Sequence, residues 1–327
     1  MIEVGRTSQV LWREAFGHLT FDHDARAATD DTIFDLASLT KVLATTPLMM
    51  MQVERGAIGL DDPVSGYLVD WNGADRADVT VRDLLAHCSG LPSWRPYFKT
   101  LQGRQQYQAA IAHEPLEYAP RSKSIYSDLD FILLGFILDG FRSTLTDRFA
   151  TLLSQMGIVE EIQFNPPQLW HQRIAPTEHD SWRGCLLVGE VHDENAAALG
   201  GAAGHAGLFG TVSAVGAGAR HLLQVLDGRT GAFRRNTLEA FITKRAEIPG
   251  SSRALGWDTM LPTSSCGTRM STRAFGHTGF TGTSLWIDPE SDVYVALLTN
   301  RVHPSRDNEA IRQVRPTLHD AVMMELR

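Results

Sequence analysis

The sequence predicts an α/β protein of the α+β kind, in which an antiparallel sheet is built from both ends of the chain and flanked by helices. Short apolar or alternating runs, typical of strands, occur near the N-terminus and again after residue 253. Between these regions the apolar residues recur mostly at helical spacing. Strands from both ends can share one sheet, so we expect a sheet domain of residues 1–74 and 201–327 and a mostly helical inserted domain of residues 75–200.

The first half of the sheet domain carries one hairpin signal and one strong helix signal. Residues 10–21 alternate loosely around a turn at Gly17, which predicts two short strands. Residues 38–55 carry apolar side chains at helical spacing and are followed by a terminating glycine, Gly56. Proline removes an internal hydrogen bond, so we expect this helix to bend at Pro47.

The remaining elements follow from local capping and periodicity. Residues 79–90 begin with a candidate N-cap, Thr80, and predict a short helix. Strand signals are scarce up to residue 200, and residues 131–138 give the best buried helix there. A further helix is expected at residues 212–226. Period-two or short apolar runs predict three late strands, at residues 255–257, 283–287 and 293–298.

The composition indicates a soluble, folded chain. Its 327 residues are 43% hydrophobic and 21% charged, which excludes disorder, collagen and coiled coils. The formal net charge of −8 provides no positive field for nucleic acid or an anionic membrane, so we expect neither as a partner. The longest apolar run, residues 131–138, is far shorter than the ~20 residues of a membrane span.

Cysteine usage and the first residues bear on the compartment. The three cysteines are far apart and odd in number, which favours reduced thiols over a disulfide framework or a thiolate zinc site. The N-terminus lacks the basic start and apolar run of a secretory signal. We therefore expect a cytoplasmic protein, or a periplasmic one if an upstream segment was removed. The sequence leaves the oligomeric state open.

Ser38 and Lys41 form the sharpest local motif, Ser-Leu-Thr-Lys at the start of an apolar helix. Residues three apart on a helix share one face, so the Lys41 amine can reach the Ser38 hydroxyl. Burial favours the neutral amine, which can accept the serine proton. Free N–H groups at the helix N-terminus can stabilise the negative charge that develops. The alternative is a chance spacing without chemistry.

Tyr126 and Asp128 precede the apolar helix of the central region. A phenol beside a cationic lysine ionises more readily and can then act as a general base. The alternative is a core tyrosine that caps the helix together with Asp128.

A glycine-rich segment, residues 276–282, precedes a strand-like run. Its glycines allow a substrate backbone to approach, and His277 and Thr278 offer polar groups to that backbone. The N–H group that follows can serve as a second oxyanion donor. The alternative is a hairpin turn that carries a surface histidine.

In this order, the three motifs resemble the serine β-lactamase and penicillin-binding-protein superfamily, whose marks are Ser-x-x-Lys, Tyr-x-Asn and Lys/His-Thr-Gly. Other segments are similar to the class C β-lactamase-like branch, and residues 191–196 are similar to its penicillin-binding-protein 4B-like members. The likeness runs from about residue 16 to residue 300 and includes residues 60–64, 84–92 and 204–209.

The resemblance implies a serine hydrolase that forms an acyl-enzyme on an ester or amide. The implied types are a β-lactamase-like esterase, a D-amino-acid peptidase and a carboxypeptidase, with a small-molecule or short-peptide substrate and no cofactor. Ser38 would attack the carbonyl, and Tyr126 with Lys41 would move protons.

The same resemblance distributes the other roles. Asp128 and His277 would belong to the catalytic group, and Thr278 and Gly279 would bind the substrate. The backbone N–H groups of Ser38 and Phe280 would hold the oxyanion, Phe280 by its position directly after His-Thr-Gly.

Two residues depart from the family pattern. Asp128 stands where asparagine is commoner, and its charge would raise the pKa of Lys41, which favours Tyr126 as the proton acceptor. His277 replaces lysine and is mostly neutral above its ordinary pKa of ~6.5, so we expect carboxylate-bearing substrates to be disfavoured relative to neutral esters. If His277 does not face the substrate, Arg273 or Arg301 is the next candidate cation.

Two other kinds of function stay open. One is a penicillin-recognising or regulatory binding protein with little turnover, which the Asp128 exchange favours. The other is a metal site, because His192, Asp193, Glu194 and His205 offer ligand types within a short stretch. No H-E-x-x-H helix or cysteine quartet accompanies them, so we expect no metal and interpret them as hydrogen-bonded structural residues.

Overall fold

The computed structural model describes residues 1–140, 143–248 and 250–326. Its strands are β1 (Ile2–Gly5), β2 (Val10–Glu14), β3 (Phe34–Asp35), β4 (Ile162–Phe164), β5 (His179–Asp180), β6 (Cys185–Leu186), β7 (Leu208–Gly210), β8 (Asp258–Thr259), β9 (Phe275–Thr278), β10 (Ser284–Asp288) and β11 (Val293–Leu297). Its α-helices are α1 (Thr46–Glu54), α2 (Val81–Leu85), α3 (Gly103–His113), α4 (Asp128–Asp139), α5 (Leu145–Met156), α6 (Glu194–Ala198), α7 (Val212–Leu226), α8 (Arg235–Ile242) and α9 (Ile311–Glu325).

The main sheet joins the two ends of the chain. Its order is β2-β1-β11-β10-β9-β8, and every neighbouring pair with a recorded register is antiparallel. In β11, Leu297 lies between Ile2 of β1 and Ser284 of β10. The predicted fold class, an antiparallel sheet built from both chain ends and flanked by helices, is confirmed.

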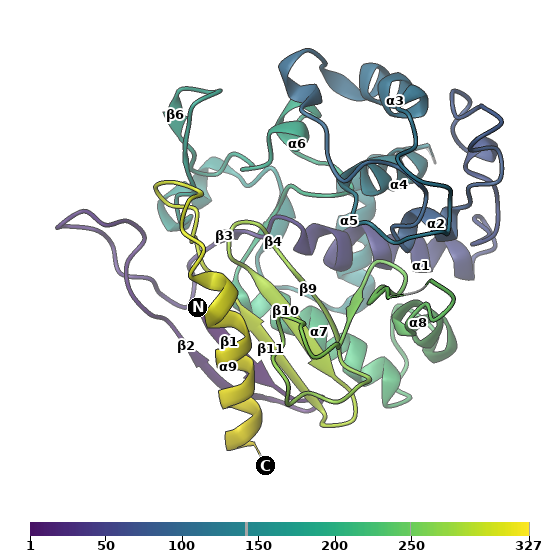
Figure 1. The fold of residues 1–327 in the computed structure, drawn as a ribbon. Helices are drawn as coiled ribbons and strands as arrows, with labels where there is room; N and C mark the ends of the chain where they lie inside the picture. Colours follow the sequence, from purple (N-terminus) through teal and green to yellow (C-terminus); the bar gives the residue numbers. More distant parts are fainter. Residues whose placement is uncertain (141–142, 249, 327) are drawn as a thin grey trace.

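Helices cover both faces of this sheet. Successive side chains of a strand point to opposite faces, so apolar residues of one strand can pack against helices on both sides. In β11, Val293 and Val295 pack with Met323 of α9, whereas Tyr294 and Ala296 join the main core that includes α7. Figure 1 shows α9 and α7 on opposite sides of the strands. Each face therefore has its own apolar cover.

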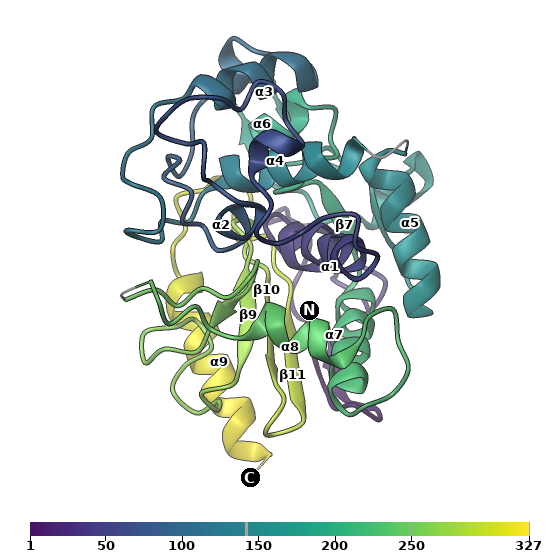
Figure 2. The ribbon, with the colours of Figure 1, turned by 90° about the vertical axis from the view of Figure 1, so that its right-hand side faces the viewer.

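A helical region lies beyond one end of the sheet. Figure 2 shows α3, α4 and α6 above the strands, with α1 between them and the sheet. Residues 129–138 of α4 are all buried, and Ser127 caps this helix by accepting the Asp130 N–H group. A second sheet, ordered β3-β7-β4, joins the strand β4 of the central region to β3, which precedes that region in the sequence, and to β7, which follows it. The domain boundaries at residues 74/75 and 200/201 stay a prediction.

Two strand predictions were misplaced. The N-terminal hairpin consists of β1 and β2, so only the first part of residues 10–21 is a strand. The cause is the β1–β11 pairing, together with a turn that the Arg6 N–H to Gln9 carbonyl bond closes. Residues 255–257 form a turn rather than a strand, since Gly256 has a φ of +86° and donates to the Leu85 carbonyl. The strand there is β8.

Two helical predictions need adjustment. Of the predicted helix at residues 38–55, residues 39–54 are helical, and residues Lys41–Thr45 among them are wound as a π-helix, η1, that leads into α1. Pro47 itself lies in the first turn of α1, where its missing N–H group costs little. The central region also contains the short strands β4, β5 and β6, which are too brief to give a periodic signal. In the described part of the chain, no helix is both long and apolar enough to cross a membrane.

Candidate active site

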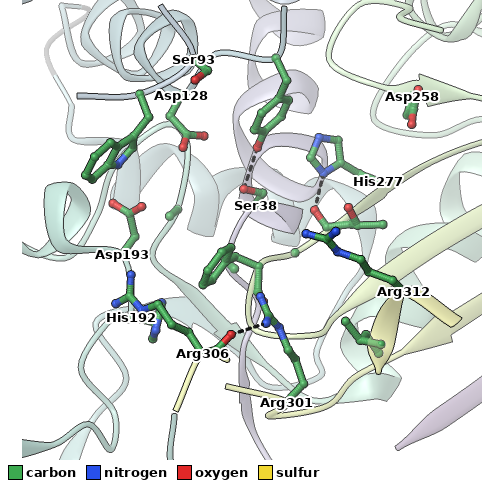
Figure 3. Close-up of a pocket in the computed structure, with 18 of the residues that line it drawn as sticks. Ser38, Ser93, Asp128, His192, Asp193, Asp258, His277, Arg301, Arg306 and Arg312 are labelled. Carbon is green, nitrogen blue, oxygen red and sulfur yellow. Dashed lines mark hydrogen bonds between the residues drawn. The ribbon is translucent and has the colours of Figure 1, made fainter. Parts of the chain in front are cut away.

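A cavity of about 690 Å³ lies between the helical region and the end of β9 (Figure 3). Its lining comes from the start of η1, from the loop before α4, from β9 and from the segment that leads into α9. It brings together seven of the residues predicted for the site: Ser38, Tyr126, Asp128, His277, Thr278, Gly279 and Phe280. Lys41 is fully buried and reaches the group through its bond to Ser38.

Ser38 is presented by a strained turn directly after β3. Ala37 has a φ of +47°, which is unusual for a residue with a side chain. The Asp35 carboxylate fixes this turn by accepting the Ala37 N–H at 2.8 Å, and the Leu36 carbonyl accepts the Thr283 hydroxyl at 3.0 Å. The turn places Ser38 at the helix start with its side chain partly exposed in the cavity.

Lys41 is held as an ammonium group. Its Nζ donates to Ser38 Oγ at 3.0 Å, to Asp128 Oδ1 at 2.7 Å and to the His205 carbonyl at 3.0 Å, so all three donors are used. Burial alone lowers the pKa of Lys41, but the neighbouring Asp128 and Tyr126 raise it by more, and the net shift is upward. The upward shift agrees with the expected effect of Asp128 and favours the charged amine over the neutral one.

Tyr126 lies on the other side of the serine. Its hydroxyl is 2.8 Å from Ser38 Oγ, and the Lys41 Nζ lies 4.9 Å from the centre of its ring. Burial raises the pKa of the phenol, Lys41 lowers it and Asp128 raises it, with a net upward shift. At neutral pH both neighbours of Ser38 therefore tend to keep their protons.

Two backbone N–H groups are available for an oxyanion. Among the hydrogen bonds of the described residues, none uses the N–H of Ser38 or that of Phe280. The Phe280 carbonyl accepts a bond from Arg301 Nε at 2.8 Å, which fixes the peptide of this turn. The Phe280 ring is half exposed and lies between Arg301, at 4.6 Å from its centre, and His192, at 5.5 Å.

His277 is a buried neutral side chain rather than a cation. Its ring Nδ1 lies 2.8 Å from the Thr278 carbonyl, and its ring centre is 5.6 Å from that of Tyr126. Burial first, and then Arg253 and Lys41, lower its pKa well below the ordinary value. Gly279 lines the cavity, and its role in substrate binding stays a prediction; a Cβ there would lie 2.1 Å from Thr283 Oγ1. The chain's own packing requires this glycine.

The positive charge of the cavity comes from arginines that sequence reasoning mostly missed. Of the two named candidates, Arg301 lines the cavity, but Arg273 lines a separate one. Arg315 is 9% exposed, and its Nη2 donates to the Gly279 and Thr283 carbonyls at 2.7 Å. The remaining lining arginines are Arg253, Arg306 and Arg312. The Arg-x-x-Arg spacing at 312 and 315 was the one available signal, since it predicts a shared helix face.

The candidate metal ligands are engaged with other protein side chains. His192 Nε2 lies 2.7 Å from Glu178 Oε2, and His205 Nε2 lies 2.8 Å from Asp193 Oδ1. Glu194 pairs with Arg306 at 2.8 Å. Over the residues that the structure describes, no group of three or more His, Cys, Asp or Glu side chains could hold a metal ion.

Comparisons with known proteins agree on one family. A family model described as Beta-lactamase matches residues 2–318. A putative D-alanyl-D-alanine carboxypeptidase of Escherichia coli K12 is 31% identical, over 91% of this chain and 77% of that protein. A protein of the same description from Salmonella agona is 32% identical, over 84% of this chain and 71% of its own length.

Solved structures share the fold at lower identity. EstCE1, a hydrolase with promiscuous acyltransferase activity, has a TM-score of 0.72 at 20% identity, over 96% of this chain and 92% of that chain. A penicillin-binding-protein homologue from Caulobacter crescentus has a TM-score of 0.71 at 19% identity, over 97% and 91%. The chain belongs to the β-lactamase family and is a serine hydrolase.

Proposed function

We propose that the protein is a carboxypeptidase-type acyl-enzyme with Ser38 as its nucleophile, and that it acts on short peptides that end in a carboxylate. The observation that carries the proposal is the placement of Ser38 Oγ, which faces the cavity within hydrogen-bond distance of both Lys41 and Tyr126. Two relatives named as putative D-alanyl-D-alanine carboxypeptidases support this substrate class.

In the proposed mechanism, Tyr126 first loses its proton to solvent, and the resulting phenolate, a minor form at neutral pH, takes the Ser38 proton while Oγ attacks the substrate carbonyl. The Ser38 and Phe280 N–H groups hold the resulting oxyanion. Tyr126 then gives the proton to the leaving amine as the C–N bond breaks. Water repeats the sequence in reverse to release the acyl group. Lys41 stays charged, stabilises the phenolate and orients Ser38.

We propose that the arginines of the cavity bind the carboxylate at the end of the substrate. Arg312 and Arg315 lie on α9, Arg315 donates to the Gly279 carbonyl, and Arg301 donates to the Phe280 carbonyl. Figure 3 shows Arg301 and Arg312 among the residues that line the cavity. A neutral His277 adds no charge there, so these guanidinium groups replace it as the anion-binding groups. We therefore replace the expectation that carboxylate-bearing substrates are disfavoured.

A fluorophosphonate label, read by intact mass spectrometry, tests the nucleophile. We expect one adduct on the parent protein and none on Ser38→Ala, because only an activated serine reacts. Undiminished labelling of Ser38→Ala would contradict the proposal. Hydrolysis of an acyl-D-alanyl-D-alanine peptide should exceed that of its C-terminal amide, and prior dialysis against a strong chelator should change neither rate.

One observation favours a second candidate, a binding protein that is acylated with little turnover. The pKa values of Lys41 and Tyr126 are both raised, which lowers the fraction of unprotonated base at neutral pH. A stoichiometric acyl-enzyme that persists for hours would select this candidate, whereas continuous peptide release would select the carboxypeptidase.

A further inference from the structure

His87 follows α2 and has an unusual backbone conformation, with a φ of +55°. This left-handed conformation turns its carbonyl and its ring toward the same segment of chain. The carbonyl accepts the Ile125 N–H at 2.9 Å, and the ring Nδ1 accepts the Ser127 N–H at 3.1 Å. His87 therefore binds the backbone directly before and directly after Tyr126.

The ring of His87 also packs against the side chain between those two bonds. It is fully buried, its centre lies 4.8 Å from that of the Tyr126 ring, and Phe131 supports it at 5.1 Å. The phenol hydroxyl ends 2.8 Å from Ser38 Oγ. One residue thus contacts the main chain on both sides of the proposed base and also the ring of that base.

The hydrogen bonds of His87 define its tautomer. Since the Ser127 N–H donates to Nδ1, that nitrogen carries no proton, and the neutral ring bears its proton on Nε2. Nε2 is buried and has no hydrogen-bond partner among the described residues. Burial, Arg253, Lys41 and His277 lower the pKa of His87 well below its ordinary value. The neighbouring Asp130, 3.5 Å from Nδ1, has a pKa raised well above its ordinary value by burial.

We infer that His87 is a positioning residue that holds Tyr126 over Ser38, through an unprotonated Nδ1 and a left-handed backbone. The inference rests on the proposed role of Tyr126 as the base. It assigns His87 no contact with the substrate, since His87 does not line the cavity. Its effect is on the rate of proton transfer and not on substrate binding.

Three substitutions separate the features of His87. His87→Asn keeps an acceptor at the position of Nδ1 and tolerates a positive φ, so it should retain kcat within a few-fold. His87→Gln places its acceptor one atom further out and should not rescue the Ser127 bond. His87→Gln and His87→Ala should each lose on the order of tenfold or more in kcat with KM unchanged, because small displacements of a catalytic group are costly.

The readout is kcat per active site, titrated with the fluorophosphonate label, so that loss of folded protein is not counted as loss of rate. Equal losses in His87→Asn and His87→Gln would contradict the inference, as would losses that vanish after this correction. The ¹⁵N resonances of His87 in the parent protein give a test that needs no activity. We expect an unprotonated Nδ1 and a protonated Nε2, and a protonated Nδ1 would overturn the inference even if Ser38 proves to be the nucleophile.

Discussion

The helical wall of the cavity, around Tyr126 and Asp128, and the strand wall, around Phe280 and Arg315, differ in how each holds its most buried cation. On the helical wall, the buried ammonium group of Lys41 is paired with the Asp128 carboxylate at 2.7 Å. On the strand wall, Arg315 donates to carbonyl groups, and within the described ranges no carboxylate lies within 4.0 Å of its guanidinium nitrogens. The more exposed Arg306 and Arg312 pair with Glu178 and Glu309, each at 2.8 Å. Paired charges fix protons in place, whereas an unpaired buried cation favours binding of an anion.

This difference divides the proposed chemistry between the walls. The helical wall sets the protonation of Ser38, Lys41 and Tyr126, because the negative charge of Asp128 raises the pKa of Lys41 and that of Tyr126. The strand wall supplies the oxyanion N–H of Phe280 and the arginines beside it. Changes on the helical wall should therefore alter kcat, and changes on the strand wall should alter KM for charged substrates.

The largest effect is expected on the helical wall. Tyr126→Phe should lower kcat by at least ~100-fold and leave KM nearly unchanged, because it removes a proton-transfer group and only one atom. Steady-state kinetics on an activated ester measure both constants. Lys41→Met should lower kcat as well, but it also leaves Asp128 without its partner and should lower the Tm. Near-normal turnover in Tyr126→Phe would return the base role to Lys41.

The strand wall should show a smaller, substrate-dependent effect. Arg312→Gln should raise KM for a peptide carboxylate by on the order of tenfold and leave a neutral ester unaffected, with the difference shrinking in high salt. Arg273→Gln is the matched control, since Arg273 is exposed and lines another cavity. Equal effects of the two substitutions on the peptide would show that the cavity arginines do not bind its carboxylate.

Acid should weaken the fold modestly. Burial lowers the pKa of His319 to about 3, whereas an unfolded histidine has a pKa of ~6.5. The unfolded chain therefore binds more protons below pH 6.5, and stability should fall as the pH decreases from there toward 3, by up to ~1.4 kcal/mol per pH unit for this residue. Urea unfolding at pH 7 and pH 5 measures the slope. His319→Leu should flatten it, since neither ring nitrogen has a hydrogen-bond partner in the described part of the chain.

The smallest effect is expected for pH, which should leave the substrate preference unchanged. Because the pKa of His277 lies well below its ordinary value, lowering the pH from 7 to 6 should leave the preference for carboxylate over neutral substrate as it was. The ratio of kcat/KM for the two substrates measures this preference. A rise in the ratio that His277→Gln abolishes would make His277 part of the positive wall.

Much of the fold was predictable because its signals are local. The α7 bounds, residues 212–226, and the pairing of both chain ends follow from periodicity, and Thr80 forms the expected cap with Asp83. The N-terminal hairpin was misplaced, since its register depends on β11 nearly three hundred residues away. A two- or three-residue strand such as β4 gives no period at all.

The residues of the candidate site that belong to short sequence motifs were predictable. Those that reach the site through contacts between distant segments were not. Local motifs pointed to Ser38 and Tyr126, and the family resemblance pointed to Phe280. The charge state of Lys41 needed the distance to Asp128 and its full burial, which no spacing contains. Likewise, Arg315 reaches the site through its bonds to the Gly279 and Thr283 carbonyls, and His87 through its bond to the Ser127 backbone, and all of these are tertiary contacts.

The pH dependence of Ser38 acylation in Asp128→Asn most directly tests the claim that the Asp128 charge keeps protons on Lys41 and Tyr126. We expect the alkaline rise of the acylation rate to move to lower pH and the rate at pH 7 to increase, because removing this charge lowers the pKa of both groups. Asp130→Asn is the control: its raised pKa favours a neutral carboxyl, so the profile should stay in place. An unchanged profile in Asp128→Asn, or a shift to higher pH, would contradict the claim.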